Sequence, residues 1–257
     1  MNKKSIILCE GETDQIILSY YLIKKFGYSY IGNGERKRLI NPKNKGESIC
    51  VYKNATNELD IWAVGSESLL HEGLNRVLRD NSINADTVYA RIAIVSDYDT
   101  EEENKNRLCK FTEVLKKYTS ESNLVQNTWM TVKQNIGFDE EIEIKIINIT
   151  IPTGSDGSLE TMLLTALSED TIDKILVEKS YEFVESIKKE ESLLKKYLNH
   201  RRLLTKAPLS AFFAIANPER TFTAFDTMLS SIDWDTFNAV QENLLNLDEL
   251  NTALPAS

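Results

Sequence analysis

The sequence predicts an α/β protein with an open, mostly parallel β-sheet, helices on both faces and a helical extension toward the C-terminal end. Short apolar runs of strand length alternate with stretches of helical periodicity up to about residue 168, a pattern typical of parallel β-α-β folds. From about residue 170 the strand-like runs give way to lysine-rich helical patterns. We therefore predict a domain at 1–168, a helical region packed on it at 169–250, and a flexible tail at 251–257.

The first predicted unit is a strand, a turn and a helix. Ile6, Ile7 and Leu8 form the apolar strand, and the segment Cys9-Glu10-Gly11-Glu12-Thr13-Asp14 follows it. Gly11 is expected to let the chain turn, and Asp14 falls in the first helical turn, where the helix dipole favours an acid. As a capping acid, Asp14 needs no functional explanation, but Glu10 lies where open α/β sheets bind ligands. The expected buried side of the helix is Ile16, Ile17, Tyr20, Tyr21 and Leu22, and the expected exposed side is Gln15, Ser19, Lys24 and Lys25.

The remaining elements follow from the same two periodicities. The predicted strands are 49–52, 59–65, 88–95 and 142–151, with 129–132 left open between strand and loop and a turn expected at 137–139. The predicted helices are 66–79, 101–118, one starting after Ser158, 172–189, 192–204, 206–216, 222–229 and 234–247.

Acidic residues follow two further strands. Asp97 and Asp99 come directly after the strand at 88–95, and their spacing of two residues directs both side chains the same way on an extended chain. Two such carboxylates suit a hard cation such as Mg²⁺ or Mn²⁺, although a polar loop before a helix would have the same composition. Glu160 follows the strand at 142–151 and a glycine-rich turn, in a first helical turn that favours an acid in any case.

These acidic stretches together resemble the Toprim domain of topoisomerases, primases and OLD-type nucleases. Glu10, Gly11 and Asp14 match its first motif, and Asp97 and Asp99 match its second. Gly65 matches the glycine that ends a strand between the two motifs, over a resemblance that spans roughly residues 4 to 165.

Two later features extend the resemblance. The glycine-rich turn before Leu159-Glu160 resembles the late acidic motif of OLD-type and stand-alone Toprim proteins. The tail, with Arg201, Arg202 and Lys206 ahead of an apolar helix and Ile232-Asp233-Trp234 later, resembles DUF3226-type proteins. The chain has no match to the phosphate-binding sequence of P-loop ATPases, so an ATPase partner would be a separate chain.

The resemblance implies a metal-dependent nuclease that hydrolyses phosphodiester bonds in DNA or RNA. It implies acid–base catalysis or metal binding by Glu10, Mg²⁺ or Mn²⁺ binding by Asp97, Asp99 and Glu160, and a carboxylate set completed by Asp14. Lys206 or Arg201 would neutralise the phosphate. Two alternatives remain: a non-catalytic module for nucleic-acid binding, phage defence or regulation that acts with a partner protein, and a phosphohydrolase of small nucleotides.

Composition limits other classes of function. The net charge of −9 among 257 residues argues against a surface that coats nucleic acid, so contacts would be local, at Arg36, Lys37 and Arg38 and at Arg201 and Arg202. Two distant histidines leave little for a zinc site or a serine–histidine–acid triad. Three scattered cysteines, and no secretory or membrane-spanning run, predict a cytoplasmic protein with reduced thiols that makes no membrane contact.

Overall fold

The computed structural model describes residues 2–32, 46–55, 57–83, 87–136, 140–220 and 225–252. The strands are β1 (Asn2–Cys9), β2 (Ser29–Tyr30), β3 (Ser48–Lys53), β4 (Glu58–Ala63), β5 (Thr87–Asp97), β6 (Met130–Ile136) and β7 (Glu140–Ile151). The α-helices are α1 (Glu12–Phe26), α2 (Leu70–Ile83), α3 (Glu101–Leu115), α4 (Leu159–Leu167), α5 (Thr171–Lys188), α6 (Glu191–Tyr197), α7 (Arg201–Ala216), α8 (Phe225–Ser230) and α9 (Asn238–Leu244). Short 3₁₀ helices are η1 (Glu67–Leu69), η2 (Pro218–Arg220), η3 (Trp234–Thr236) and η4 (Leu245–Asn251).

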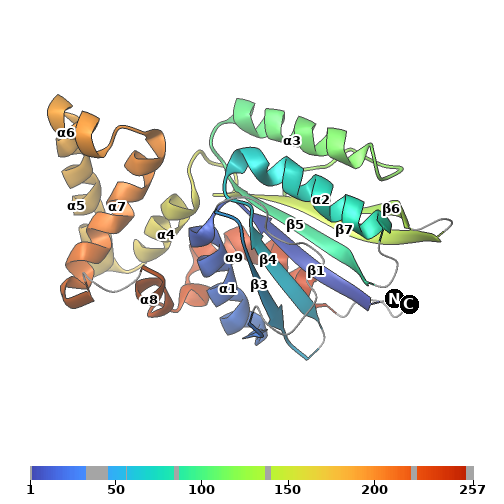
Figure 1. Cartoon of the computed structure of the whole chain (residues 1–257). Helices are drawn as coiled ribbons and strands as arrows, with labels where there is room; N and C mark the ends of the chain where they lie inside the picture. Colours follow the sequence, from blue (N-terminus) through green and yellow to red (C-terminus); the bar gives the residue numbers. More distant parts are fainter. Residues whose placement is uncertain are drawn as a thin grey trace.

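The strands form one mostly parallel sheet, as the sequence predicts (Figure 1). Its order is β2-β3-β4-β1-β5-β7-β6, and the central strands β4, β1, β5 and β7 run parallel. The outer strands β2, β3 and β6 pair antiparallel to their neighbours. Because parallel strands end at the same edge, the segments after β1, β4, β5 and β7 meet there.

Helices cover both faces of the sheet (Figure 1). The stripes of α2 and α3 pack on one face around Leu74, Leu78 and Phe111. On the other face, α1, α4 and the segment from α8 to η4 share one core that contains Trp234 and Leu250. The chain leaves β1 toward one face through α1 and leaves β5 toward the other through α3, so the switch in direction lies beside the end of β1.

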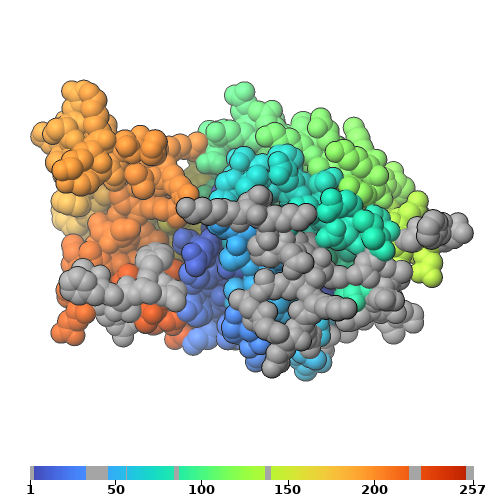
Figure 2. Space-filling view, in the orientation of Figure 1, coloured from blue at the N-terminus to red at the C-terminus, as the bar shows by residue number. Residues whose placement is uncertain are grey.

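The helices α5, α6 and α7 form a lobe at one end of the molecule, orange in Figures 1 and 2. α5 packs on α7, and α7 also contacts α4. The sequence predicts separate helices at 192–204 and 206–216, but the break lies at 198–200 and one helix runs from Arg201 to Ala216 with Pro208 inside it. Lys206 therefore lies in the same helix as Arg201 and Arg202.

The predicted exposed side of α1 was wrong at two positions. Gln15 and Ser19 are buried, with 5% and 7% of their surfaces exposed. The Gln15 side chain donates to the carbonyl oxygens of Ile61 (2.7 Å) and Ser48 (3.2 Å). The sheet and the segment from α8 to η4 enclose α1 from two sides, so polar side chains that find partners are buried with the apolar ones.

Two smaller points complete the fold. The segment at 129–132, which the sequence leaves open, lies at the start of β6, whereas the turn predicted at 137–139 falls outside the described residues. Within the described ranges, no helix is long and apolar enough to cross a membrane.

Candidate active site

The acidic residues predicted from three strand ends gather around one cavity of about 390 Å³. Glu10 and Asp14 come from the end of β1 and the start of α1, Asp97 and Asp99 from the end of β5, and Glu160 from the first turn of α4. The other residues that line the cavity are Gly11, Thr13, Gly65, Ser66, Glu67, Gly157, Ser158, Arg201, Arg202, Thr205 and Lys206.

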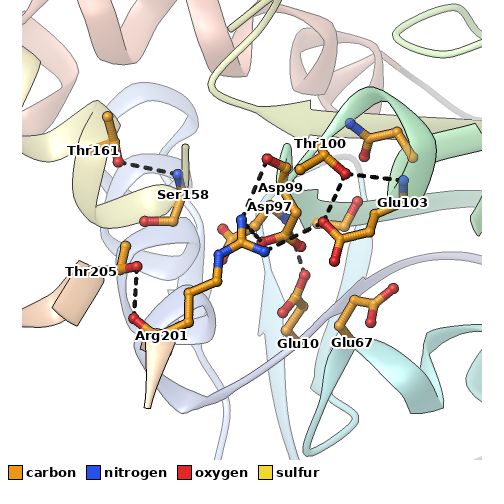
Figure 3. Close-up of polar contacts among 12 residues, drawn as sticks. Glu10, Glu67, Asp97, Asp99, Thr100, Glu103, Ser158, Thr161, Arg201 and Thr205 are labelled. Carbon is orange, nitrogen blue, oxygen red and sulfur yellow. Dashed lines mark hydrogen bonds and ion pairs between the residues drawn. The ribbon is translucent and has the colours of Figure 1, made fainter. Parts of the chain in front are cut away.

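Glu10 and Asp97 lie together at the centre of the site (Figure 3). The backbone N–H of Asp97 donates to Oε1 of Glu10 at 3.0 Å, and the N–H of Leu159 donates to Oδ1 of Asp97 at 2.9 Å. The end of β1 is also tied to the segment after β4, because Gly65 N–H donates to the Glu10 carbonyl oxygen at 2.9 Å. These backbone contacts fix the direction in which both carboxylates point.

Three of these acids hold protons unusually tightly. Burial, and then repulsion from Asp14, raises the pKa of Glu10 to about 7. Burial, and then repulsion from Glu10, raises the pKa of Asp97 to about 9. Burial raises the pKa of Asp14 to about 6, although its Oδ2 accepts from the Gly11 N–H at 2.8 Å. A buried cluster of acids with too little positive charge around it is the expected environment for a cation.

Asp99 is held by two guanidinium groups. Its Oδ2 lies 3.2 Å from Nη2 of Arg107, and its Oδ1 lies 3.1 Å from Nη2 of Arg201. Burial raises the pKa of Asp99, and the two arginines oppose that rise. Arg107 also binds Glu67, which lines the cavity, with Nε 2.9 Å from Oε1.

Arg107 and Glu67 were not predicted from the sequence as residues of the site. A signal for Arg107 was present, because it precedes Phe111 by four residues and so shares the buried face of α3. Glu67 follows the strand-ending Gly65 by two residues, the position at which other strand ends of this chain carry acids.

Glu160 is fully engaged at the start of α4. Its Oε2 accepts from the Ser158 hydroxyl at 2.9 Å, and its Oε1 lies 2.7 Å from Nζ of Lys206. Ser158 caps the helix, with Thr161 Oγ1 accepting from its N–H at 3.2 Å. Glu160 thus binds the N-cap residue and a basic side chain at once, from the first helical turn in which an acid is favourable.

Helix α7 supplies a basic wall opposite the acids. Arg201, Arg202, Thr205 and Lys206 lie one or four residues apart, which places them on one side of the first two turns. Arg202 makes no ion pair with any part of the chain that the structure describes. Positive charges in the first turn of a helix oppose its dipole, so their presence at this cavity suits an anion. The predicted basic residues Arg36, Lys37 and Arg38 lie outside the described residues.

Comparison with known proteins places the chain in a family. The family described as "Protein of unknown function (DUF3226)" matches residues 4–246. The chain belongs to the DUF3226 family. Among solved structures, the DUF3226 chain is similar to the crystal structure of the hypothetical protein PH0156 from Pyrococcus horikoshii OT3, with 16% identity, a TM-score of 0.48, and coverage of 98% of this chain and 96% of that one. No curated protein matches it.

The donors of this DUF3226 protein suit a hydrated cation. Among the described residues, no three histidine, cysteine or acidic side chains already form a group that could hold a metal ion. Mg²⁺ commonly binds through one or two carboxylates and keeps several waters, and Glu10 and Asp97 form such a pair. The predicted ligands Asp99 and Glu160 are instead engaged by basic side chains, which a cation would have to displace.

Two of the three glycines that line the cavity differ in the backbone conformation they adopt. Gly65 has φ of +101°, a conformation that side chains other than glycine rarely adopt. Gly11, the N-cap of α1, has φ of −145° and ψ of 179°, an extended conformation open to any residue. The chain bends at Gly11 as predicted, but these dihedral angles do not require glycine, and the Gly11 N–H binds Asp14.

Alanine substitutions at these two glycines are expected to differ in their effect on the free energy of unfolding. Gly65→Ala should lower the free energy of unfolding by about 1–2 kcal/mol, because of strain at positive φ. Gly11→Ala should change it by less than about 0.5 kcal/mol, since an added Cβ meets only Asp14 Oδ2 at 3.7 Å. Urea denaturation of both variants would measure the difference, and equal effects would contradict this account.

Proposed function

We propose that the cavity is the active site of a metal-dependent hydrolase that cleaves phosphodiester bonds in DNA or RNA, related to the Toprim nucleases. The observation that carries the proposal is the juxtaposition of two walls. A carboxylate wall centred on Glu10 and Asp97 faces a basic wall formed by Arg201, Arg202 and Lys206 across one cavity. A divalent cation and a phosphate group would find complementary charge side by side.

Each wall has its own proposed role. Glu10 and Asp97 would hold Mg²⁺ or Mn²⁺, and the bound ion would supply Lewis-acid stabilisation of the phosphate and a more acidic water. Glu10, with a pKa of about 7, is also suited to accept or donate a proton near neutral pH. Arg202 and Lys206 would bind the phosphate oxygens, with Lys206 exchanging Glu160 for the substrate.

The test measures cation binding first and nucleic-acid cleavage second. Calorimetry with Mn²⁺ should show binding by the wild type and by Glu101→Gln, and little or none by Glu10→Gln and Asp97→Asn. Glu101 is a suitable control because it is an exposed acid paired with Lys105, outside the cavity. Plasmid nicking and RNA cleavage should then fall about 10²–10⁴-fold in Glu10→Gln, the range for loss of an acid–base group. Binding that is unchanged in Asp97→Asn would exclude this site.

Two specific observations favour other functions for the same cavity. The ion pairs of Asp99 and Glu160 favour a non-catalytic module that works through a partner chain, such as a separate ATPase or a phage-defence protein. Wild-type protein that binds no Mn²⁺ would support that reading. The cavity volume of about 390 Å³, which is in the range of small-molecule pockets, instead favours small nucleotides as substrates, and hydrolysis of mononucleotides without any cleavage of plasmid or RNA would support that function.

A further inference from the structure

The side chain of Arg107 occupies an unusual place for a charged group. Only 3% of its surface is exposed, and a buried guanidinium is costly unless its N–H groups all have acceptors. Arg107 contributes no surface to the cavity, so it would act on the site through the residues it binds and through its charge.

Five acceptors surround this guanidinium. Nε lies 2.9 Å from Oε1 of Glu67, and Nη2 lies 3.2 Å from Oδ2 of Asp99. Nη1 donates to the Ser96 hydroxyl (2.8 Å), the Asp97 carbonyl oxygen (2.7 Å) and Asn104 Oδ1 (3.1 Å). Arg107 therefore reaches both the side chains beside the cavity and the backbone of the strand end itself.

The order of the strands shows which strand ends Arg107 connects. Glu67 follows β4 and Asp99 follows β5, and β1 lies between those two strands. One guanidinium thus links the two strand ends on either side of β1. Glu10 directly follows β1 and lies between them. In addition, the peptide units of Asp97 are fixed from two directions, since its N–H donates to Glu10 and its carbonyl oxygen accepts from Arg107.

We propose that Arg107 is a positioning residue that sets the geometry of the Glu10–Asp97 pair and thereby the affinity of the cavity for a divalent cation. The proposal rests on the proposed function for the identity of the ligand, but the clamp itself rests on contacts within the chain. A lysine keeps the charge but cannot reproduce the planar fork that binds several acceptors at once. Loss of the fork therefore disturbs the geometry while preserving the charge.

The experiment compares wild type, Arg107→Lys and Asn104→Ala. Calorimetry with Mn²⁺ should show affinity about 10- to 100-fold weaker in Arg107→Lys, the range for residues that orient metal ligands. Asn104 is outside the cavity and contacts Arg107, so Asn104→Ala, which removes one of the five acceptors, should weaken binding less than Arg107→Lys does. Affinity equal to that of the wild type in both variants overturns the proposal.

Hydrogen exchange supplies a readout that needs no metal. In folded Arg107→Lys, peptides that cover Ser96–Asp99 and Ser66–Glu67 should exchange faster, while peptides from β7 should exchange as in the wild type. Unchanged exchange at the strand ends overturns the clamp, and so does acceleration spread evenly over the chain, which would indicate general destabilisation. If Arg107→Lys does not fold, Asn104→Ala carries the same comparison. Absence of Mn²⁺ binding by the wild type would contradict the proposed function. The hydrogen-exchange comparison would still decide the role of Arg107.

Discussion

Between pH 5 and pH 8, the metal-free protein is expected to lose several kcal/mol of its free energy of unfolding. Burial gives Glu10 and Asp97 pKa values of about 7 and about 9 in the folded protein. Their ordinary values are 4.5 and 3.8. Within this window the folded state binds more protons than the unfolded state, so stability falls as the pH rises.

Urea denaturation at several pH values with a chelator present would measure this loss. Because a cation favours the charged carboxylates, Mg²⁺ should restore stability most strongly at pH 8, by about 2.7 kcal/mol at a concentration one hundred times its dissociation constant. Asp97→Asn removes one titrating acid and should flatten the pH dependence while raising the stability of the metal-free protein at pH 8. If the stability of the wild type rises between pH 5 and pH 8, the raised pKa values of Glu10 and Asp97 are contradicted.

Trp234→Ala is expected to lower the free energy of unfolding by about 4 kcal/mol. Trp234 is 1% exposed and lies in the core shared by α1, α4 and the sheet, and its ring N–H donates to the Leu229 carbonyl oxygen at 2.8 Å.

A chain that ends at Ser168, the predicted domain boundary, should fail to fold, because the segment from α8 to η4 covers one face of the sheet.

Denaturant unfolding and circular dichroism would test both variants. Ile172→Ala is the matched control, since Ile172 is an apolar residue with 76% of its surface exposed on α5, and it should change stability by less than about 0.5 kcal/mol. A 1–168 chain with a cooperative unfolding transition would show instead that the boundary predicted from the sequence separates independent domains.

The sequence predicts the sheet well because its central strands are buried on both faces. Ile6–Leu8 and residues 92–95 are continuous apolar runs, whereas β7 alternates isoleucines with polar residues before it becomes buried on both faces. Acids at the ends of such strands must meet at one edge, so the grouping of Glu10 and Asp97 follows from topology alone.

Side-chain partnerships could not be predicted in the same way. Glu160 meets Lys206 and Asp99 meets Arg201 only because α7 begins at Arg201 and packs near α4. Nothing local in the sequence fixes that tertiary placement. Gln15 illustrates the same limit, since its burial depends on acceptors in β3 and β4 that are more than thirty residues away.

The last described segment also constrains how this chain is made. Nη1 of Arg91 in β5 donates to the Thr252 carbonyl oxygen at 2.5 Å, and Nδ2 of Asn57 donates to the Leu250 carbonyl oxygen at 3.0 Å. On the ribosome, all seven strands are synthesised before these partners emerge. The nascent sheet therefore exposes one apolar face while the helical lobe is still being translated. The native packing of the sheet is therefore complete only once the chain up to Thr252 has been synthesised.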